Sequence, residues 1–210
     1  MSESTAPRLL IVCTANAIRS PFVEHLLRAR LVEMGGAEVQ IRSAGAAARP
    51  GMPAEPNVVE VGRAHGIHLD DHRTRLLDES MLSLGTTVLC AEAAHRRTVL
   101  DMRPGLLDTT FTVREFARLL GDEGPPAGAG WESLIRAAAQ LRTRVRRGSA
   151  REDDLVDPIG QPPTVWAEFE RQAVGAVETI AHAVAASVVD GGDGPAIPLT
   201  RRALRARRTP

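Results

Sequence analysis

Residues 8–21 read RLLIVCTANAIRSP and contain three kinds of local structure in succession. The apolar run at 8–12 is typical of a strand buried on both faces of a parallel sheet. Short, uncharged residues follow, and Ser20 and Pro21 then suit the N-cap and the first turn of a helix. The segment therefore predicts a strand, a tight loop and a helix, in that order.

The same alternation continues along the rest of the chain. Gly35 and Gly36 end the first helical pattern, and short apolar runs predict strands at 39–41 and 87–89. Further helices are expected over 57–65, 91–101, 113–120, 131–147 and 163–189. Alternating strands and helices predict the α/β class, with a doubly wound, four-stranded parallel sheet flanked by helices. The loop should lie at the carboxyl edge of the first strand.

The composition narrows the class of protein. Acidic and basic side chains number 26 each, apolar residues make up 43 % and charged residues 25 %, as in soluble globular proteins. All the basic residues are Arg, and several of them lie in the last ten positions. Residues 1–200 therefore carry more acidic than basic side chains, which argues against nucleic acid as the ligand. No apolar run is long enough to span a membrane. Two cysteines cannot make a disulfide framework, so a cytoplasmic location is expected.

One domain accounts for most of the chain. Residues 1–189 show no internal repeat and no second periodic core, so a single domain is expected there. Within it, the Gly, Pro and polar residues around 121–150 predict an extra loop–helix segment. Residues 190–210 are rich in Gly, Pro and Arg and have little to bury, which predicts a disordered, Arg-rich tail. The oligomeric state does not follow from the sequence.

Cys13 and Arg19 bracket the loop after the first strand, with five residues between them. A loop of short residues before a helix can direct its N–H groups at one point, where the helix dipole also favours an oxyanion. A thiol in that field is stabilised as the thiolate, and a guanidinium matches two oxygens of a phosphate or arsenate. Cys90 and Arg96 repeat the spacing, but Glu92 and helix-forming residues lie between them, so no anion site is expected there.

Four motifs, in this order, resemble the low-molecular-weight protein tyrosine phosphatases. The loop is similar to the family's Cys-x-Gly-Asn-x-x-Arg-Ser-Pro, and Ser-Ala-Gly at 43–45 follows the second strand as in the family. Residues 66–73 read GIHLDDHR, similar to the family's Gly-Ile-x-x-x-x-His-Arg block. Asp157 and Pro158 precede the final helix, where the family keeps its general acid. The resemblance covers residues 8–189 and implies the family's fold and a phosphomonoester hydrolase activity.

The resemblance also implies the chemistry of the site. Cys13 is expected to be the nucleophile that forms a phosphocysteine, Arg19 to hold the equatorial oxygens, and Asp157 to act as general acid and then as general base. The rest of the phosphate-binding loop consists of Thr14, Ala15, Asn16, Ala17, Ile18 and Ser20. No cofactor and no metal are implied. The partner implied is a phosphorylated protein, nominally at tyrosine, or a small phosphomonoester.

Supporting roles follow from the same resemblance. Ser20 would donate a hydrogen bond to the sulfur and ease its departure. Asn16 would hold the loop in its strained shape together with Ser43 and His72. The histidines are scattered and suggest no set of metal ligands, and four of them are typical of ordinary helix residues: His25, His65, His95 and His182.

Several positions depart from the family's pattern. Ala15 stands where the family has Gly, and a positive φ there would cost of order 1 kcal/mol. Ile18 occupies the place of a thiol that protects the nucleophile in many members. Ile159 stands where members often have Tyr or Trp. Ala17 stands where many members have the larger Ile. We therefore expect little discrimination between phosphotyrosine peptides and small aryl phosphates.

Two other functions and one question about Cys90 stay open on the sequence alone. An arsenate reductase of the same fold would use Cys13 to attack arsenate, although thioredoxin-coupled members need two further cysteines. A catalytically inactive phosphate-binding module is the second alternative, and the joint presence of Cys13, Arg19 and Asp157 argues against it. Cys90 follows a strand expected next to the first one, so one hypothesis is a protective Cys13–Cys90 disulfide, and the other is a buried, inert Cys90.

Overall fold

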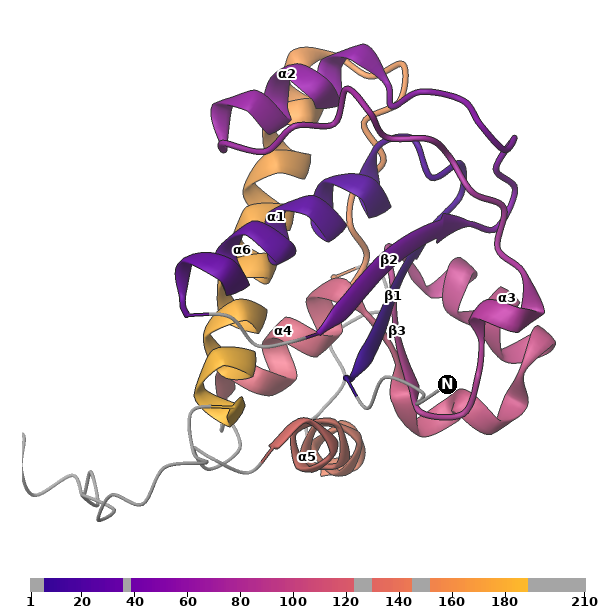
Figure 1. The fold of residues 1–210 in the computed structure, drawn as a ribbon, viewed down its shortest axis with the longest axis vertical. Helices are drawn as coiled ribbons and strands as arrows, with labels where there is room; N and C mark the ends of the chain where they lie inside the picture. Colours follow the sequence, from indigo (N-terminus) through magenta and orange to yellow (C-terminus); the bar gives the residue numbers. More distant parts are fainter. Residues whose placement is uncertain (1–5, 36–38, 123–129, 145–151, 189–210) are drawn as a thin grey trace, which may run out of the picture.

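The computed structural model describes residues 6–35, 39–122, 130–144 and 152–188. Four parallel strands form one sheet in the order β2-β1-β3-β4, and Figure 1 labels the first three of them. The strands are β1 (Arg8–Cys13), β2 (Gln40–Gly45), β3 (Thr86–Cys90) and β4 (Thr110–Thr112). β1 therefore lies inside the sheet, with Cys13 at its carboxyl end. The predicted fold class is confirmed.

Helices cover both faces of this sheet (Figure 1). The α-helices are α1 (Arg19–Glu33), α2 (Pro56–Ala64), α3 (Ala93–Met102), α4 (Val113–Asp122), α5 (Gly130–Arg144) and α6 (Pro163–Val188). Two short 3₁₀ helices, η1 (Glu79–Met81) and η2 (Pro104–Thr109), lie in the connections. α1 and α4 both pack against α6 on one face, whereas α3 and η2 lie on the other.

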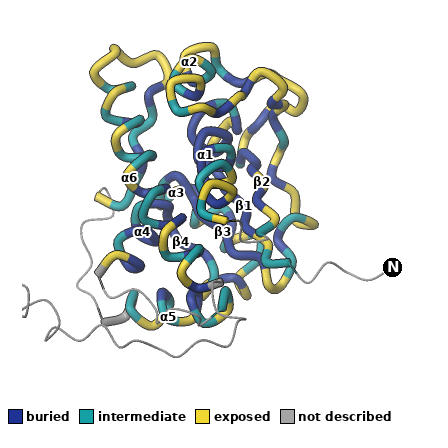
Figure 2. The backbone as a smooth tube through the Cα atoms, turned by 60° about the vertical axis from the view of Figure 1, so that its left-hand side comes forward, coloured by how far each residue is buried: buried dark blue, intermediate teal, exposed yellow. Residues whose placement is uncertain are grey.

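Alternation along β1 builds the two halves of the core, because successive side chains of a strand point to opposite faces. Leu9 and Ile11 belong to the larger cluster, formed with α1, α4, α5 and α6. Leu10 and Val12 belong to the smaller cluster, which includes Val99 of α3. β3 is buried along its whole length (Figure 2), as a central parallel strand should be.

The predicted helices and the first three strands are confirmed, with ends shifted by a few residues, whereas β4 has no counterpart in the sequence-based prediction. It contains three residues, Thr-Phe-Thr, which are too few for a periodic pattern. Pairing of Thr110 with Val88 of β3 makes it a strand. Only the tertiary fold supplies that partner.

The extra helix predicted around residues 131–147 is present as α5. Its buried residues Leu134, Ile135 and Ala138 belong to the same core cluster as β1. The segments on either side of α5, and the tail at 190–210 for which disorder is predicted, lie outside the described residues. No helix within the described ranges is both long and apolar enough to cross a lipid bilayer.

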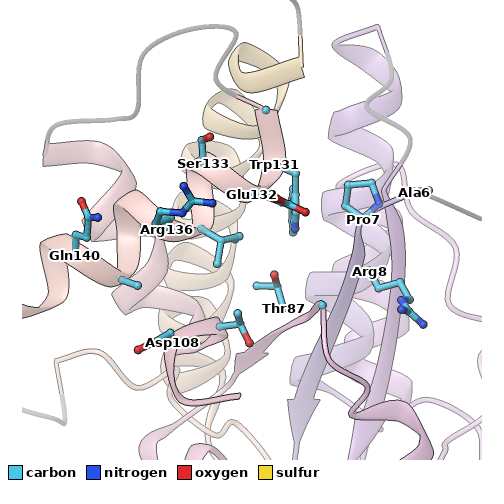
Figure 3. A pocket seen from close by; sticks show the side chains of 15 residues that line it. Ala6, Pro7, Arg8, Thr87, Asp108, Trp131, Glu132, Ser133, Arg136 and Gln140 are labelled. Carbon is cyan, nitrogen blue, oxygen red and sulfur yellow. The ribbon is translucent and has the colours of Figure 1, made fainter. Parts of the chain in front are cut away.

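A cavity of about 1180 Å³ lies between α5 and the sheet (Figure 3). Its walls include Arg8 and Thr87, at the amino ends of β1 and β3, and Trp131 and Arg136 on α5. Because Cys13 is at the other end of β1, this cavity opens at the edge of the sheet opposite the Cys13 loop. It is not part of the site predicted from the sequence.

Candidate active site

The loop from Cys13 to Arg19 wraps around the Cys13 sulfur. The backbone N–H of Asn16 donates to Cys13 Sγ at 3.3 Å, and the Ser20 hydroxyl lies 3.0 Å from the same atom. α1 begins at Arg19 with Ile18 as its N-cap residue, so the predicted N-cap role of Ser20 is wrong. Ser20 lies in the first turn, from where its hydroxyl reaches the sulfur. Both contacts would stabilise a negatively charged sulfur.

Asn16 is the centre of the hydrogen bonds that shape the loop. Its side-chain amide donates to Ser20 Oγ at 2.9 Å and to Ser43 Oγ at 2.8 Å. Its side-chain oxygen accepts from the Arg75 backbone N–H at 2.8 Å, and its backbone oxygen lies 2.7 Å from His72 Nε2. The structure thus brings Asn16, Ser20, Ser43 and His72 together, although they come from three separate segments.

The unusual backbone conformation of the loop lies at Asn16. Asn16 has φ +55°, and no other non-glycine residue in the described ranges has a positive φ. The expectation of positive-φ strain at Ala15 is therefore wrong. Asparagine tolerates this left-handed conformation better than most residues, because its short polar side chain can hydrogen-bond locally.

Gly45, at the end of β2, allows the loop to pack directly against the sheet. A Cβ atom placed there would lie 2.6 Å from Thr14 O and 2.7 Å from Asn16 N, too close for any side chain. The neighbouring Ala46 and Ala47 N–H groups donate to the carbonyls of Cys13 and Thr14, each at 2.8 Å. The Ser-Ala-Gly motif thus supplies both a hydroxyl and the space for this contact.

Glu24 of α1 supports the loop from behind, and the sequence analysis did not identify it. Its side chain is 2 % exposed, accepts from the Ser43 hydroxyl, and pairs with Arg28 Nη2 at 2.6 Å. A buried carboxylate is costly unless it is paired and hydrogen-bonded, as Glu24 is. The signal for it in the sequence is an acidic residue on the apolar face of a helix.

Glu24, His25 and His72 form the one group among the described residues whose ligand atoms could surround a metal ion, since these atoms lie within 4.8 Å of one another. Both oxygens of Glu24 already accept hydrogen bonds, from Arg28 and Ser43. Burial lowers the pKa of His25 and of His72. The contacts present fit a hydrogen-bonded support for the loop better than a metal centre.

Arg19 connects the loop to the distant segment that carries Asp157. Its side chain is 3 % exposed, and its Nη2 donates to Asp157 Oδ2 at 2.7 Å and to Thr14 Oγ1 at 3.2 Å. Its Nη1 donates to the Leu155 carbonyl at 3.4 Å and lies 3.5 Å from Glu92 Oε2. A buried guanidinium is thus paired on both sides, which fixes its plane at the loop.

The Asp157 segment is itself held against the carboxyl ends of the strands. The Leu155 N–H donates to the carbonyl of Ala91, just after β3, at 2.7 Å. Asp154 accepts the backbone N–H of Ala93 at 2.7 Å, and burial raises the pKa of this carboxyl. These bonds leave the Asp157 side chain 40 % exposed and directed to Arg19.

Glu92 and His95, at the start of α3, are two further site residues that the sequence analysis missed. His95 was expected to be an ordinary helix residue, but it is 4 % exposed and its Nε2 lies 2.9 Å from Thr14 Oγ1. Its Nε2 also lies 3.3 Å from Glu92 Oε1. Burial, followed by the charge of Arg19, lowers the pKa of His95 to about 4. Their position in the sequence could have indicated them, since both residues follow β3 and the fold places β3 beside β1.

The remaining loop residues and Ile159 differ in exposure. Ile18 is 6 % exposed and belongs to the core, and Ala17 is half-buried with its carbonyl accepting the Glu55 N–H at 3.0 Å. Ile159 is 57 % exposed, and its N–H donates to Asp157 Oδ1 at 3.2 Å. An exposed aliphatic side chain therefore stands next to Asp157.

The hypothesis of a Cys13–Cys90 disulfide is wrong. The strand register pairs Cys90 with Val12, the residue before Cys13, and places both Val12 and Cys90 in the smaller core cluster. Cys13 belongs to the larger cluster on the other face of the sheet, so the two side chains point apart and both thiols are free. Burial raises the pKa of Cys90 far above its usual range, which makes it an inert core residue.

Comparison with known proteins settles which family shares this geometry. The model of the family described as Low molecular weight phosphotyrosine protein phosphatase matches residues 8–122. The chain belongs to this family. The matched range includes Cys13 and Arg19 and ends before Asp157, which the fold brings to the loop. The protein is thus a phosphatase of the cysteine-dependent, low-molecular-weight type.

Individual relatives of this low-molecular-weight phosphatase have two kinds of name. A probable low molecular weight protein-tyrosine-phosphatase EpsP from Ralstonia nicotianae is 34 % identical over 107 residues, which are 51 % of this chain and 70 % of the relative. A protein-arginine-phosphatase from Geobacillus stearothermophilus is 32 % identical over 141 residues, 67 % of this chain and 92 % of the relative. The solved low molecular weight protein tyrosine phosphatase from T. tengcongensis has a TM-score of 0.63 and 28 % identity, covering 84 % of this chain and 99 % of that one.

Proposed function

We propose that this phosphatase hydrolyses phosphorylated protein side chains through a phosphocysteine on Cys13, with Arg19 holding the phosphoryl oxygens and Asp157 as general acid and base. The single observation that carries the proposal is the Arg19 contact with Asp157 at 2.7 Å, which joins a proton donor to the loop around the Cys13 sulfur. A nucleophile, an anion holder and a proton donor are the groups that phosphoryl transfer to sulfur requires.

In the first step, the Cys13 thiolate attacks phosphorus, and the bond between phosphorus and the leaving atom breaks. Asp157 gives its proton to that leaving atom, so that a tyrosine product departs as the neutral phenol. Arg19 and the loop N–H groups hold the equatorial oxygens while charge develops on them. An incoming phosphate dianion competes with the Asp157 carboxylate for Arg19, which favours the protonated carboxyl that this step needs.

In the second step, water attacks the phosphocysteine and the Asp157 carboxylate removes a proton from that water. The phosphorus–sulfur bond breaks, inorganic phosphate leaves, and the Cys13 thiolate is restored beside the Ser20 hydroxyl and the Asn16 N–H. The proposed scheme uses no metal and no cofactor.

Phosphotyrosine is the nominal substrate, and protein phosphoarginine is the second candidate. The relative from Geobacillus stearothermophilus is named as a protein-arginine-phosphatase and is matched over nearly its whole length. Two observations favour this candidate. The carboxylates of Glu92 and Asp157 both pair with Arg19 and are partly exposed, and the exposed side chain next to Asp157, Ile159, is aliphatic. Carboxylates attract a cationic guanidinium leaving group, whereas a tyrosine ring is held best by an aromatic wall.

The proposed reaction also indicates where the protein works and which kind of molecule it binds. A nucleophilic thiol works only when reduced, and both Cys13 and Cys90 are free thiols. We therefore place the protein in the reducing cytoplasm. The acidic balance of residues 1–200 favours a phosphorylated protein over nucleic acid as the partner.

The test is hydrolysis of para-nitrophenyl phosphate by the wild type, by Cys13→Ser, and by Cys90→Ala as a control that removes the other thiol. Turnover by the wild type and by Cys90→Ala, abolished in Cys13→Ser, supports the proposal. Phosphate binding without turnover would instead identify an inactive phosphate-binding module. Arsenate-dependent consumption of a small thiol, without release of phosphate, would identify an arsenate reductase. Matched peptides with phosphotyrosine or phosphoarginine then decide the substrate class by their kcat/KM.

A further inference from the structure

Four side chains form a closed ring of polar contacts beside the Cys13 loop. Thr14 Oγ1 lies 3.2 Å from Arg19 Nη2 and 2.9 Å from His95 Nε2. Glu92 completes the ring, since one of its oxygens lies 3.3 Å from His95 Nε2 and the other 3.5 Å from Arg19 Nη1. The guanidinium that is to hold phosphate is therefore connected to α3 by two routes, one through Thr14 and one through Glu92.

The environment of His95 decides which of its ring nitrogens carries the proton. His95 is 4 % exposed, and its Nδ1 is buried without a hydrogen-bond partner among the described residues. A buried N–H without an acceptor is costlier than a buried lone pair without a donor. The proton therefore belongs on Nε2, which faces two acceptors, the Thr14 hydroxyl and the Glu92 carboxylate.

This tautomer orients the Thr14 hydroxyl. A hydroxyl oxygen has two lone pairs and one proton. Arg19 and His95 both donate to Thr14 Oγ1, so they occupy the lone pairs and the hydroxyl proton must point elsewhere. Thr14 is an exposed residue of the loop, and its oxygen lies next to the Arg19 nitrogen that would contact a phosphate.

We propose that Thr14 donates its hydroxyl proton to a phosphoryl oxygen of the substrate, and that His95, supported by Glu92, is the positioning residue that orients this hydroxyl. The proposal rests on the proposed function, because it assumes that phosphate binds at Arg19. Thr14 becomes a specific ligand for the anion, and the start of α3 becomes part of the phosphate site.

Two pairs of variants separate the hydroxyl from the space that the side chains fill. Thr14→Ser keeps the hydroxyl, whereas Thr14→Val keeps the shape and removes it. His95→Gln keeps a donor close to the position of Nε2, whereas His95→Phe keeps a ring without a donor. His182→Phe on α6 is the matched control, because His182 is an exposed histidine whose Nδ1 lies 2.8 Å from the Glu178 carbonyl of its own helix.

The readouts are binding of inorganic phosphate by calorimetry and kcat/KM for para-nitrophenyl phosphate. Hydrogen bonds to charged groups predict a loss of roughly 10- to 100-fold for Thr14→Val in both measurements. His95→Phe should weaken both by about tenfold, and Thr14→Ser and His95→Gln should recover most of the loss. The double variant Thr14→Val with His95→Phe should lose little more than Thr14→Val alone, because His95 acts through Thr14. His182→Phe should match the wild type.

Wild-type phosphate affinity in Thr14→Val would overturn the proposal, and so would equal losses in His95→Gln and His95→Phe. Fully additive losses in the double variant would show that His95 does not act through Thr14 and would also overturn it. The melting temperature of each variant identifies losses that come from unfolding. Because phosphate binding is measured without turnover, a failure of the proposed catalytic function and a failure of this inference are distinguishable.

Discussion

Asp157 Oδ2 lies 2.7 Å from Nη2 of Arg19, although 138 positions separate the two residues along the chain. Arg19 is in the first turn of α1, and Asp157 is in the segment that precedes α6. The two helices pack side by side, and the bonds of Leu155 and Asp154 to the start of α3 hold the intervening segment in place. The carboxyl proposed as the proton donor and the guanidinium proposed to hold the anion therefore meet beside the Cys13 loop.

Replacing Asp157 by Asn should reduce kcat by about 10²- to 10⁴-fold, the usual contribution of general acid–base catalysis. The loss should shrink for aryl phosphates with very acidic leaving groups, which depart without a proton. A series of substituted phenyl phosphates measures this dependence. Asp101→Asn, at an exposed position on α3, is the control. A loss of equal size across the series would remove Asp157 from the role of general acid.

Replacing Ile159 by Tyr should strengthen binding of phosphotyrosine peptides by up to roughly tenfold, since an aromatic pair contributes about 0.5–1.5 kcal/mol beyond buried area. Ile159 is 57 % exposed, so the larger ring meets no core packing. In the wild type we expect KM for phosphotyrosine peptides to be little lower than KM for small aryl phosphates. Tight, sequence-selective turnover by the wild type would show that another part of the surface grips the ring.

Asn16→Ala and Asn16→Gly should both lower stability and activity, because each removes the side-chain bonds to Ser20 and Ser43 and takes the acceptor away from the Arg75 N–H, where an unsatisfied buried group costs about 1–3 kcal/mol. Asn16→Gly should be the more stable of the two by about 1 kcal/mol, since glycine adopts φ +55° without strain. Urea unfolding of both variants measures the difference. Equal stability of the two would mean that the backbone at this position carries no conformational cost.

Gly45→Ala should abolish most of the activity, because its Cβ would lie 2.6 Å from Thr14 O and would displace the loop from the sulfur. Gly175→Ala is the matched control, since Gly175 is exposed within α6 and has open space around its Cβ position. Alanine there should raise stability by up to about 1 kcal/mol and leave turnover unchanged. Activity assays and thermal melts of the pair distinguish loop displacement from a general effect of the added methyl group.

Stability should fall as the pH is lowered from about 6.5 to about 4, because the pKa of His95 is about 4 in the folded protein and near 6.5 in the unfolded chain. The unfolded state binds the extra proton over this window, so acid favours unfolding, by up to about 3 kcal/mol from this group. His72 and His25, whose pKa values are also lowered, act in the same direction. The difference between the wild type and His95→Gln isolates the contribution of His95. Parallel curves for the two proteins would show that His95 is not the source.

The sequence alone determined the fold class, the helices, three of the four strands and the position of the loop between Cys13 and Arg19. These features depend on short-range patterns, namely apolar runs, helical periodicity and a change of residue type at the end of a strand. The four motifs were also sufficient to predict the family, and with it the residues Asn16, Ser43 and His72 that the structure brings together.

Only the tertiary structure decided the features that depend on which segments meet. Strand register separated Cys13 from Cys90, because a shift of one residue moves a side chain to the other face of the sheet. Packing at the carboxyl edge of the sheet brought Glu92 and His95 to the loop. The positive φ of the loop lies at Asn16, whereas the sequence analysis expected it at Ala15. Long-range contacts of this kind leave no periodic trace in the sequence, since each partner satisfies its local pattern equally well as a helix, strand or turn residue.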